Sequence, residues 1–158
     1  ISILKIKSRN SDFHSRFSAR ERTYLYLIRN DPSPSMINHN REWNIRNKLD
    51  INLMKKGAKK FIGTHDFSTF RASNCAAKSP IRTIKKIQII KSKKQIKIRI
   101  KSPSFLKSQV RSMVGSLKYL SEKKWDLKKF NIILKSKDRK KCAPLAPAHG
   151  LYLEKVTY

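Results

Sequence analysis

The stretch from Thr83 to Glu122 carries the clearest pattern in this chain and reads TIKKIQIIKSKKQIKIRIKSPSFLKSQVRSMVGSLKYLSE. Between Gln95 and Lys101, isoleucine alternates with lysine or arginine at every second position. This period is typical of a β-strand with one buried and one exposed face. We therefore expect residues 83–101 to form a β-hairpin with an apolar face and a cationic face.

A helix is expected directly after this hairpin. Apolar residues recur at steps of four and three between Leu106 and Leu120, which is the spacing of an amphipathic helix that ends near Glu122. One flank of this helix carries only small residues: Ser108, Ser112, Gly115 and Ser116. Small side chains let another backbone or a ligand come close, so we expect a near neighbour along this flank.

The remaining elements follow from similar patterns. Alternating tyrosine, leucine and isoleucine predict a strand over Arg22–Ile28, and the Pro, Ser and Asn residues of Asn30–Asn40 predict a loop. Two further helices are expected over Asp50–Gly63 and Asp126–Ser136, and a final strand over Leu151–Tyr158.

The resulting order is strand, helix, strand, strand, helix, helix, strand. It predicts an α+β fold of the ferredoxin-like (split βαβ) type, with an antiparallel sheet, helices on one face and one added helix. We expect a single domain over residues 1–158, with a leading segment at 1–21 and a βαββααβ core at 22–158. RNA-recognition modules share this order, but the strand QIKIRIK lacks the aromatic residues on which those modules stack bases.

The chain is strongly basic, with 38 Lys and Arg against 10 Asp and Glu and a formal net charge of +28. This charge favours an acidic partner such as nucleic acid, but the heavy use of Lys, Ile and Asn is also typical of AT-rich codons. The sequence has no apolar run of membrane-spanning length and no signal peptide. We therefore expect a soluble, cytoplasmic protein without a membrane partner, and thiols at Cys75 and Cys142.

No metal or organic cofactor is expected. His65, Cys75, Cys142 and His149 are the conceivable ligands, but they do not form the close pairs that zinc sites use. With only four glycines, the chain also offers no glycine-rich phosphate loop.

Two polar residues lie where apolar ones are expected. Tyr24 lies within the first strand, and Arg111 lies within the long helix between Val110 and Met113. A guanidinium stays charged at any working pH and pairs in a forked manner with carboxylate or phosphate, so Arg111 could orient an anion. Pattern alone also allows the simpler alternatives, in which Tyr24 is a core aromatic and Arg111 a solvated side chain at the helix edge.

Five segments favour functional roles for these two residues, because they resemble the C-terminal half of the tRNA pseudouridine synthase A family in order and spacing. They are DFHSRFSARERTYLYLI (12–28), GTHDFSTFRAS (63–73), KSPIRTI (78–84), FLKSQVRSMVGSL (105–117) and APAHGLYL (146–153).

The resemblance implies an isomerase that converts uridine to pseudouridine at positions 38–40 of the tRNA anticodon stem-loop, without metal or cofactor. It implies that Tyr24 packs against the target base and is a candidate proton acceptor, and that Arg111 pairs with a nucleophilic Asp. It also implies a homodimer.

The family's nucleophile lies in an R-T-D-x-G-x-H motif of the N-terminal half, and no Asp of this sequence stands in that setting. We therefore expect the N-terminal half of the same enzyme to be a partner, and this chain to be inactive alone. The alternative is a non-catalytic basic RNA-binding or ribosome-associated module. Further candidate RNA contacts, inside or beside the matching segments, are Arg16, Arg71, Lys78, Arg82 and His149.

Overall fold

The sheet is built around β1 (Glu21–Asn30), which has neighbours on both sides. On one side β1 pairs antiparallel with β6 (Gln95–Ser102), which pairs in turn with β5 (Lys86–Ser92). On the other side, the first half of β1 pairs antiparallel with β7 (Leu151–Thr157), and its last residues pair in parallel with β2 (Trp43–Ile45). The order β7-β1-β6-β5 is that of the ferredoxin-like arrangement, which confirms the predicted fold class.

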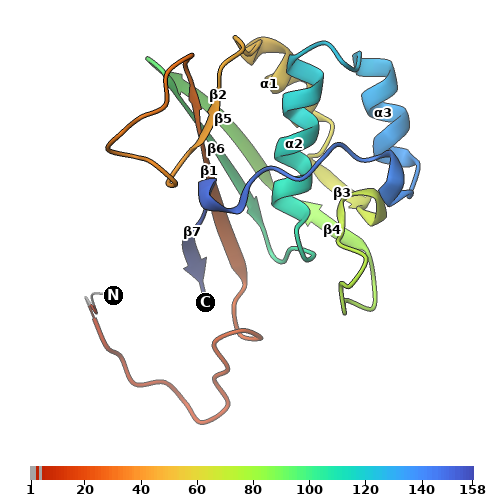
Figure 1. Cartoon of the computed structure of the whole chain (residues 1–158). Helices are drawn as coiled ribbons and strands as arrows, with labels where there is room; N and C mark the ends of the chain where they lie inside the picture. The colour runs from red at the N-terminus through yellow and green to blue at the C-terminus, as the bar shows by residue number, and fades with distance from the viewer. Residues whose placement is uncertain (1–2, 4) are drawn as a thin grey trace.

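Helices α1 (Ile51–Lys59) and α2 (Gln109–Ser121) cover one face of this sheet, and α3 (Leu127–Lys135) packs beside them, as Figure 1 shows. A separate two-stranded sheet of β3 (Gly63–Asp66) and β4 (Ile81–Ile84) lies below α2 and α3 in this view. The computed structural model describes residue 3 and residues 5–158. Within these residues, no helix combines the length and apolar character needed to cross a membrane.

Most of the predicted elements are present, and the differences have local causes. The long helix begins at Gln109 because Ser108 adopts a left-handed conformation with φ of 64°. The short strands β2 and β3 were not predicted, since three or four residues are too few to establish a period. The leading segment has no strand or helix at residue 3 or over residues 5–20, and its residues 1, 2 and 4 lie outside the described part.

The predicted hairpin consists of β5 and β6 and has the expected two faces, whereas Thr83 and Ile84 belong to β4, which pairs with β3 instead. The isoleucines of β6 at positions 96, 98 and 100 are fully buried, and they face Ile28, Tyr26 and Tyr24 of β1. The cations on the other face are partly neutralised within the chain, because Arg99 donates two hydrogen bonds to Glu154 at 2.8 and 2.9 Å.

The small-residue flank of α2 has the close neighbour that the sequence predicts. A Cβ atom at position 115 would overlap the carbonyl oxygen of Pro144, because the loop before β7 crosses α2 at Gly115. The same loop continues to Ala146, whose backbone N–H donates to the carbonyl of Arg111 at 3.2 Å. Gly115 therefore fixes the distance between α2 and the segment that leads into β7.

Replacing Gly115 with alanine tests this contact. In an open helix the change is stabilising by about 1 kcal/mol, but here the methyl group meets backbone atoms that cannot move aside independently. We expect Gly115→Ala to lower the free energy of unfolding by about 2 kcal/mol, measured by urea denaturation. Asn52→Ala, on the exposed side of α1, is the control and should leave stability unchanged or slightly raised; a stabilised Gly115→Ala protein would contradict the contact.

Candidate functional site

A cavity of about 810 Å³ lies beside Tyr24 at the start of β1. The ring of Tyr24 meets the ring of Phe105 edge-on, with centroids 5.1 Å apart. The walls come from the segment before β1, the start of β1, the loop between β3 and β4, β4 itself and the residues leading into α2. They are Arg16, Phe17, Ala19, Arg22, Asn74, Cys75, Ala76, Ala77, Arg82, Pro103, Ser104, Phe105, Leu106, Lys107 and Ser108. Aromatic rings and cations thus surround one cavity, a combination suited to a nucleotide.

The arginines of this cavity differ in how far they are already used. The Arg22 guanidinium donates to the carbonyls of Pro103 at 2.6 Å and Ala19 at 3.3 Å, and it also donates to the carbonyl of Arg16. Arg82 donates through Nη1 to Ser79 and Ile81, but its buried Nε has no partner within the described residues. Arg22 therefore braces the cavity wall, while Arg82 keeps a donor free.

Cys75 forms part of the same wall. The backbone N–H groups of Ala77 and Lys107 donate to its sulfur, and together with the nearby Arg71 and Arg82 they lower the pKa of the thiol. This places Arg71 at the cavity as well, although its side chain is not part of the wall. The backbone N–H groups are the main cause of the lowered pKa, and the two arginines add to it.

Arg111 is held by the segment that precedes β7. Its Nε donates to the carbonyl of Ala146 at 2.6 Å, and the next carbonyl, that of Pro147, accepts a hydrogen bond from the Tyr26 hydroxyl at 2.7 Å. Burial raises the pKa of Tyr26, and the positive charge of Arg111 acts in the opposite direction. Two consecutive carbonyls therefore fix Arg111 and Tyr26 side by side.

Tyr24 and Arg111 face the same side of the sheet. Tyr24 and Tyr26 are two positions apart in β1, so both point toward the helices. Arg111 lies beside Tyr26, and one helical turn before it Ser108 lines the Tyr24 cavity. Within residues 3 and 5–158, no Asp or Glu forms an ion pair with Arg111.

The other predicted contacts are divided between places. Arg16 and Arg82 share the cavity with Tyr24, whereas Lys78 is exposed on the loop between β3 and β4. His149 lies in η3 (Ala148–Gly150) and lines a different cavity, next to Trp43. Sequence reasoning did not identify Phe105 and Lys107 as parts of the site, although both lie within the matching segment 105–117.

Residues 58–158 match the family model described as tRNA pseudouridine synthase. Among curated proteins, the chain is similar over its whole length to proteins named tRNA pseudouridine synthase A. It is 60% identical to that of Pelagibacter ubique strain HTCC1062, covering 64% of that protein, and 40% and 39% identical to those of Brucella anthropi and Brucella ovis, covering 63% of each. The chain thus spans less than two thirds of the length of these relatives.

The hydrogen bond from Tyr26 to Pro147 can be tested through stability. Tyr26→Phe leaves a buried carbonyl without its donor, so we expect a loss of about 1 kcal/mol in the free energy of unfolding. Tyr152→Phe is the matched control, because Tyr152 also donates to a backbone carbonyl, at 2.6 Å to Arg41, but at an exposed position. Its loss should be smaller.

The pH dependence gives a second measurement on the same variant. The pKa of the Tyr26 hydroxyl is raised in the folded state. As pH rises above about 10, this hydroxyl therefore loses its proton in the unfolded chain at a lower pH than in the folded chain. The contribution of Tyr26 is therefore complete below that pH and declines above it. The original protein should lose stability more steeply than Tyr26→Phe between about pH 9 and 11; parallel curves would mean that the phenol ionises freely.

Proposed function

Because the chain belongs to the tRNA pseudouridine synthase family, we propose that it supplies one wall of the active site of an enzyme that isomerises uridine to pseudouridine in the anticodon stem-loop of tRNA. The observation that supports this proposal is that Tyr24 lines a cavity of about 810 Å³, while Arg111 lies one helical turn after Ser108, which lines the same cavity. The cavity is large enough for a nucleotide turned out of its stack, which this chemistry requires.

Arg111 is suited to hold a carboxylate in its ionised form. Its Nε donates to the carbonyl of Ala146, which fixes the orientation of the guanidinium, and its two terminal nitrogens make no hydrogen bond or ion pair within the described residues. An opposite charge a few ångströms away keeps a buried carboxylate deprotonated. We propose that this carboxylate is the nucleophilic Asp, and that it comes from the N-terminal part of the relatives that the chain does not cover.

Tyr24 has the complementary role. Its ring is half-buried against Phe105, which leaves one face for the target base. In the proposed reaction the bond between the ribose and the uracil nitrogen breaks, the base turns, and a bond to the uracil carbon forms. That carbon must then lose its proton, and we propose that the Tyr24 hydroxyl oxygen accepts it while the hydroxyl releases its own proton to water.

The exposed edge of β7 is the proposed docking site for that N-terminal part. β7 pairs with β1 along one side, and Tyr152, Leu153, Glu154 and Lys155 are all exposed. Unpaired strand edges bind further strands through their backbone groups. Leu153 is 54% exposed and Phe17, beside the Tyr24 cavity, is 75% exposed, so both would gain apolar cover.

Two broader aspects of the proposal follow the family resemblance. We propose that the complete enzyme is a homodimer, and that it works in the cytoplasm on tRNA. Both Cys75 and Cys142 are free thiols, which agrees with a reducing compartment. Size-exclusion chromatography with light scattering measures the molar mass of the complete enzyme. The mass of a monomer at working concentration would contradict the homodimer.

The catalytic role of Arg111 is tested in the chain joined to the N-terminal part of the Pelagibacter relative. Arg111→Lys keeps the positive charge but removes the planar guanidinium that can donate two hydrogen bonds to one carboxylate. The kcat for pseudouridine formation should therefore fall about 100-fold, while the Kd for tRNA changes little. Arg99→Lys is the control, since Arg99 lies on the opposite face of the sheet and should retain full turnover. An Arg111→Lys enzyme with normal turnover would remove Arg111 from the active site.

The same joined protein distinguishes the enzyme from a simple RNA-binding module. Pseudouridine in the anticodon stem-loop, detected by chemical labelling of the tRNA, supports the enzyme. Tight tRNA binding without any pseudouridine, in a protein whose N-terminal part is folded, would favour the non-catalytic module.

A further inference from the structure

A second cavity, of about 320 Å³, lies at the other end of β1. It opens at the edge of the sheet where the pairing of β1 with β7 ends at Tyr26 and the pairing with β2 begins at Ile28. From Tyr24 to Arg29 the strand advances about 17 Å, so this cavity is separate from the one beside Tyr24. The proposed reaction does not use it.

Glu42 gives this cavity its chemistry. The side chain lines the cavity and is only 4% exposed, and its Oε2 accepts a hydrogen bond from Nε2 of Gln95 at 2.9 Å. Its Oε1 is buried and has no hydrogen-bond partner within the described residues; the Nη1 atom of Arg29 is 4.0 Å away. A buried carboxylate oxygen without a donor is costly, so a ligand in this cavity that brings a donor to Oε1 would be favoured.

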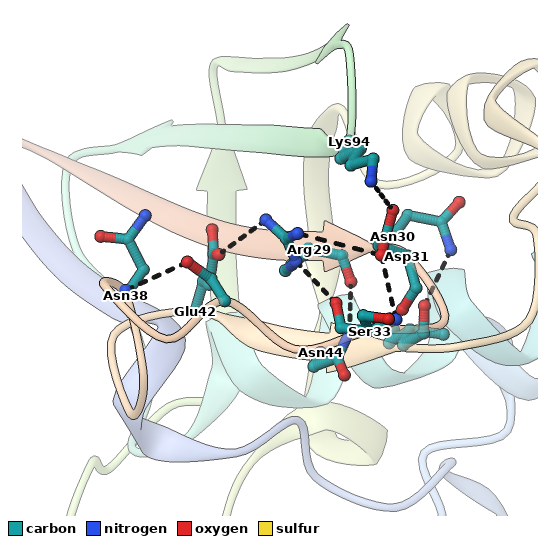
Figure 2. Close-up of polar contacts among 10 residues, drawn as sticks. Arg29, Asn30, Asp31, Ser33, Asn38, Glu42, Asn44 and Lys94 are labelled. Atoms are coloured by element: carbon teal, nitrogen blue, oxygen red, sulfur yellow. Dashed lines mark hydrogen bonds and ion pairs between the residues drawn. The ribbon is translucent and has the colours of Figure 1, made fainter.

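The surrounding network holds Glu42 in place, as Figure 2 shows. Arg29 donates through Nε to Ser33 at 2.9 Å, and Asn44 donates through Nδ2 to the carbonyl of Asp31 at 2.8 Å. The nearby carboxylate of Asp31 is fully engaged, since Lys94 lies 2.8 Å from its Oδ2 and Ser33 N–H donates to its Oδ1. These contacts hold the loop between β1 and β2 in one conformation. Of the two carboxylates in this loop, Glu42 is the one with an oxygen, Oε1, that accepts no hydrogen bond within the described residues.

The other walls favour a flat ligand rather than a metal ion. Trp43, His39, His149 and Pro147 line the cavity, and the rings of tryptophan and histidine stack on planar groups. In the described part of the chain, no three His, Cys, Asp or Glu side chains are placed to hold a metal ion. The guanidinium of Arg29 beside Glu42 also repels a divalent cation.

We propose that this cavity binds one unpaired nucleobase of the RNA and selects a base that carries an exocyclic amine, adenine, cytosine or guanine, over uracil. The amine donates to Oε1 of Glu42 while the ring stacks between the walls; a carboxylate accepting from an exocyclic amine is a known way of reading bases. The proposal rests on the proposed function, because it takes the ligand to be RNA.

The cavity is also connected to the active site. Pro147 forms part of its wall and accepts the hydrogen bond of Tyr26, while the preceding Ala146 holds Arg111. One segment thus contacts both the bound base and the catalytic arginine. A base in the second cavity would therefore help to place the RNA in register with Tyr24.

The experiment compares pentanucleotides of adenine, cytosine and uracil bound to the 158-residue chain, because all three carry the same phosphates. Adenine and cytosine pentamers should bind about tenfold more tightly than the uracil pentamer, and they should shift the ring proton NMR signals of His39 and His149. Glu42→Gln, which can turn its amide NH₂ toward the cavity, should abolish this preference.

Glu154→Gln is the matched control. It removes one negative charge, as Glu42→Gln does, but from an exposed position on β7. Any gain in RNA affinity that comes only from the lost charge should therefore appear in both variants, while Glu154→Gln should keep the preference for adenine and cytosine. The preference is a ratio of two affinities measured on the same protein. A modest loss of folding stability in a variant lowers both affinities alike and therefore leaves the ratio unchanged.

Two results would overturn the proposal. One is equal affinity for the three pentamers in the original chain, with unshifted His39 and His149 signals. The other is a Glu42→Gln protein that keeps the same preference as Glu154→Gln. Neither result depends on turnover. If the joined enzyme makes pseudouridine but the chain shows no preference among the pentamers, the proposed function stands and only the proposal for the second cavity fails.

Discussion

The structure depends on the way one loop segment satisfies two side chains. The consecutive carbonyls of Ala146 and Pro147 accept hydrogen bonds from Arg111 and Tyr26, and the loop reaches them because Gly115 lets it cross α2 closely. A half-buried guanidinium and a buried phenol both need partners, so this segment has little freedom. The same constraint orients Arg111 on the face where Tyr24 lies.

The large positive charge has more than one use. Arg99 and Lys101 on the open face are paired with Glu154 and Glu21, at 2.8 and 2.7 Å, so part of the charge is neutralised within the chain. By contrast, Arg82 beside the Tyr24 cavity keeps a buried donor, Nε, that has no partner in the described part of the chain. The position of a cation, rather than the total of +28, therefore indicates which groups can bind phosphate or carboxylate.

The sequence predicted the main strands, the helices and the fold class because their periods extend over many residues. The alternation in β6 and the four-three spacing in α2 each correspond to a buried face that the structure confirms. The second cavity was not predictable, since it is formed by a turn-rich loop, the short strand β2 and His149, which are far apart in the chain. Tyr24 and Arg111 drew attention as polar residues in apolar surroundings, but only the family resemblance gave them roles, and these remain predictions.

The central claim is that Arg111 keeps a nucleophilic carboxylate from the N-terminal part ionised. The most direct measurement is the acidic limb of the pH dependence of kcat/KM for pseudouridine formation, in the chain joined to that part. Arg111→Met removes the opposite charge, so the carboxylate should protonate more readily and the limb should move up by about one pH unit or more. A limb at the same pH in both proteins would contradict the account.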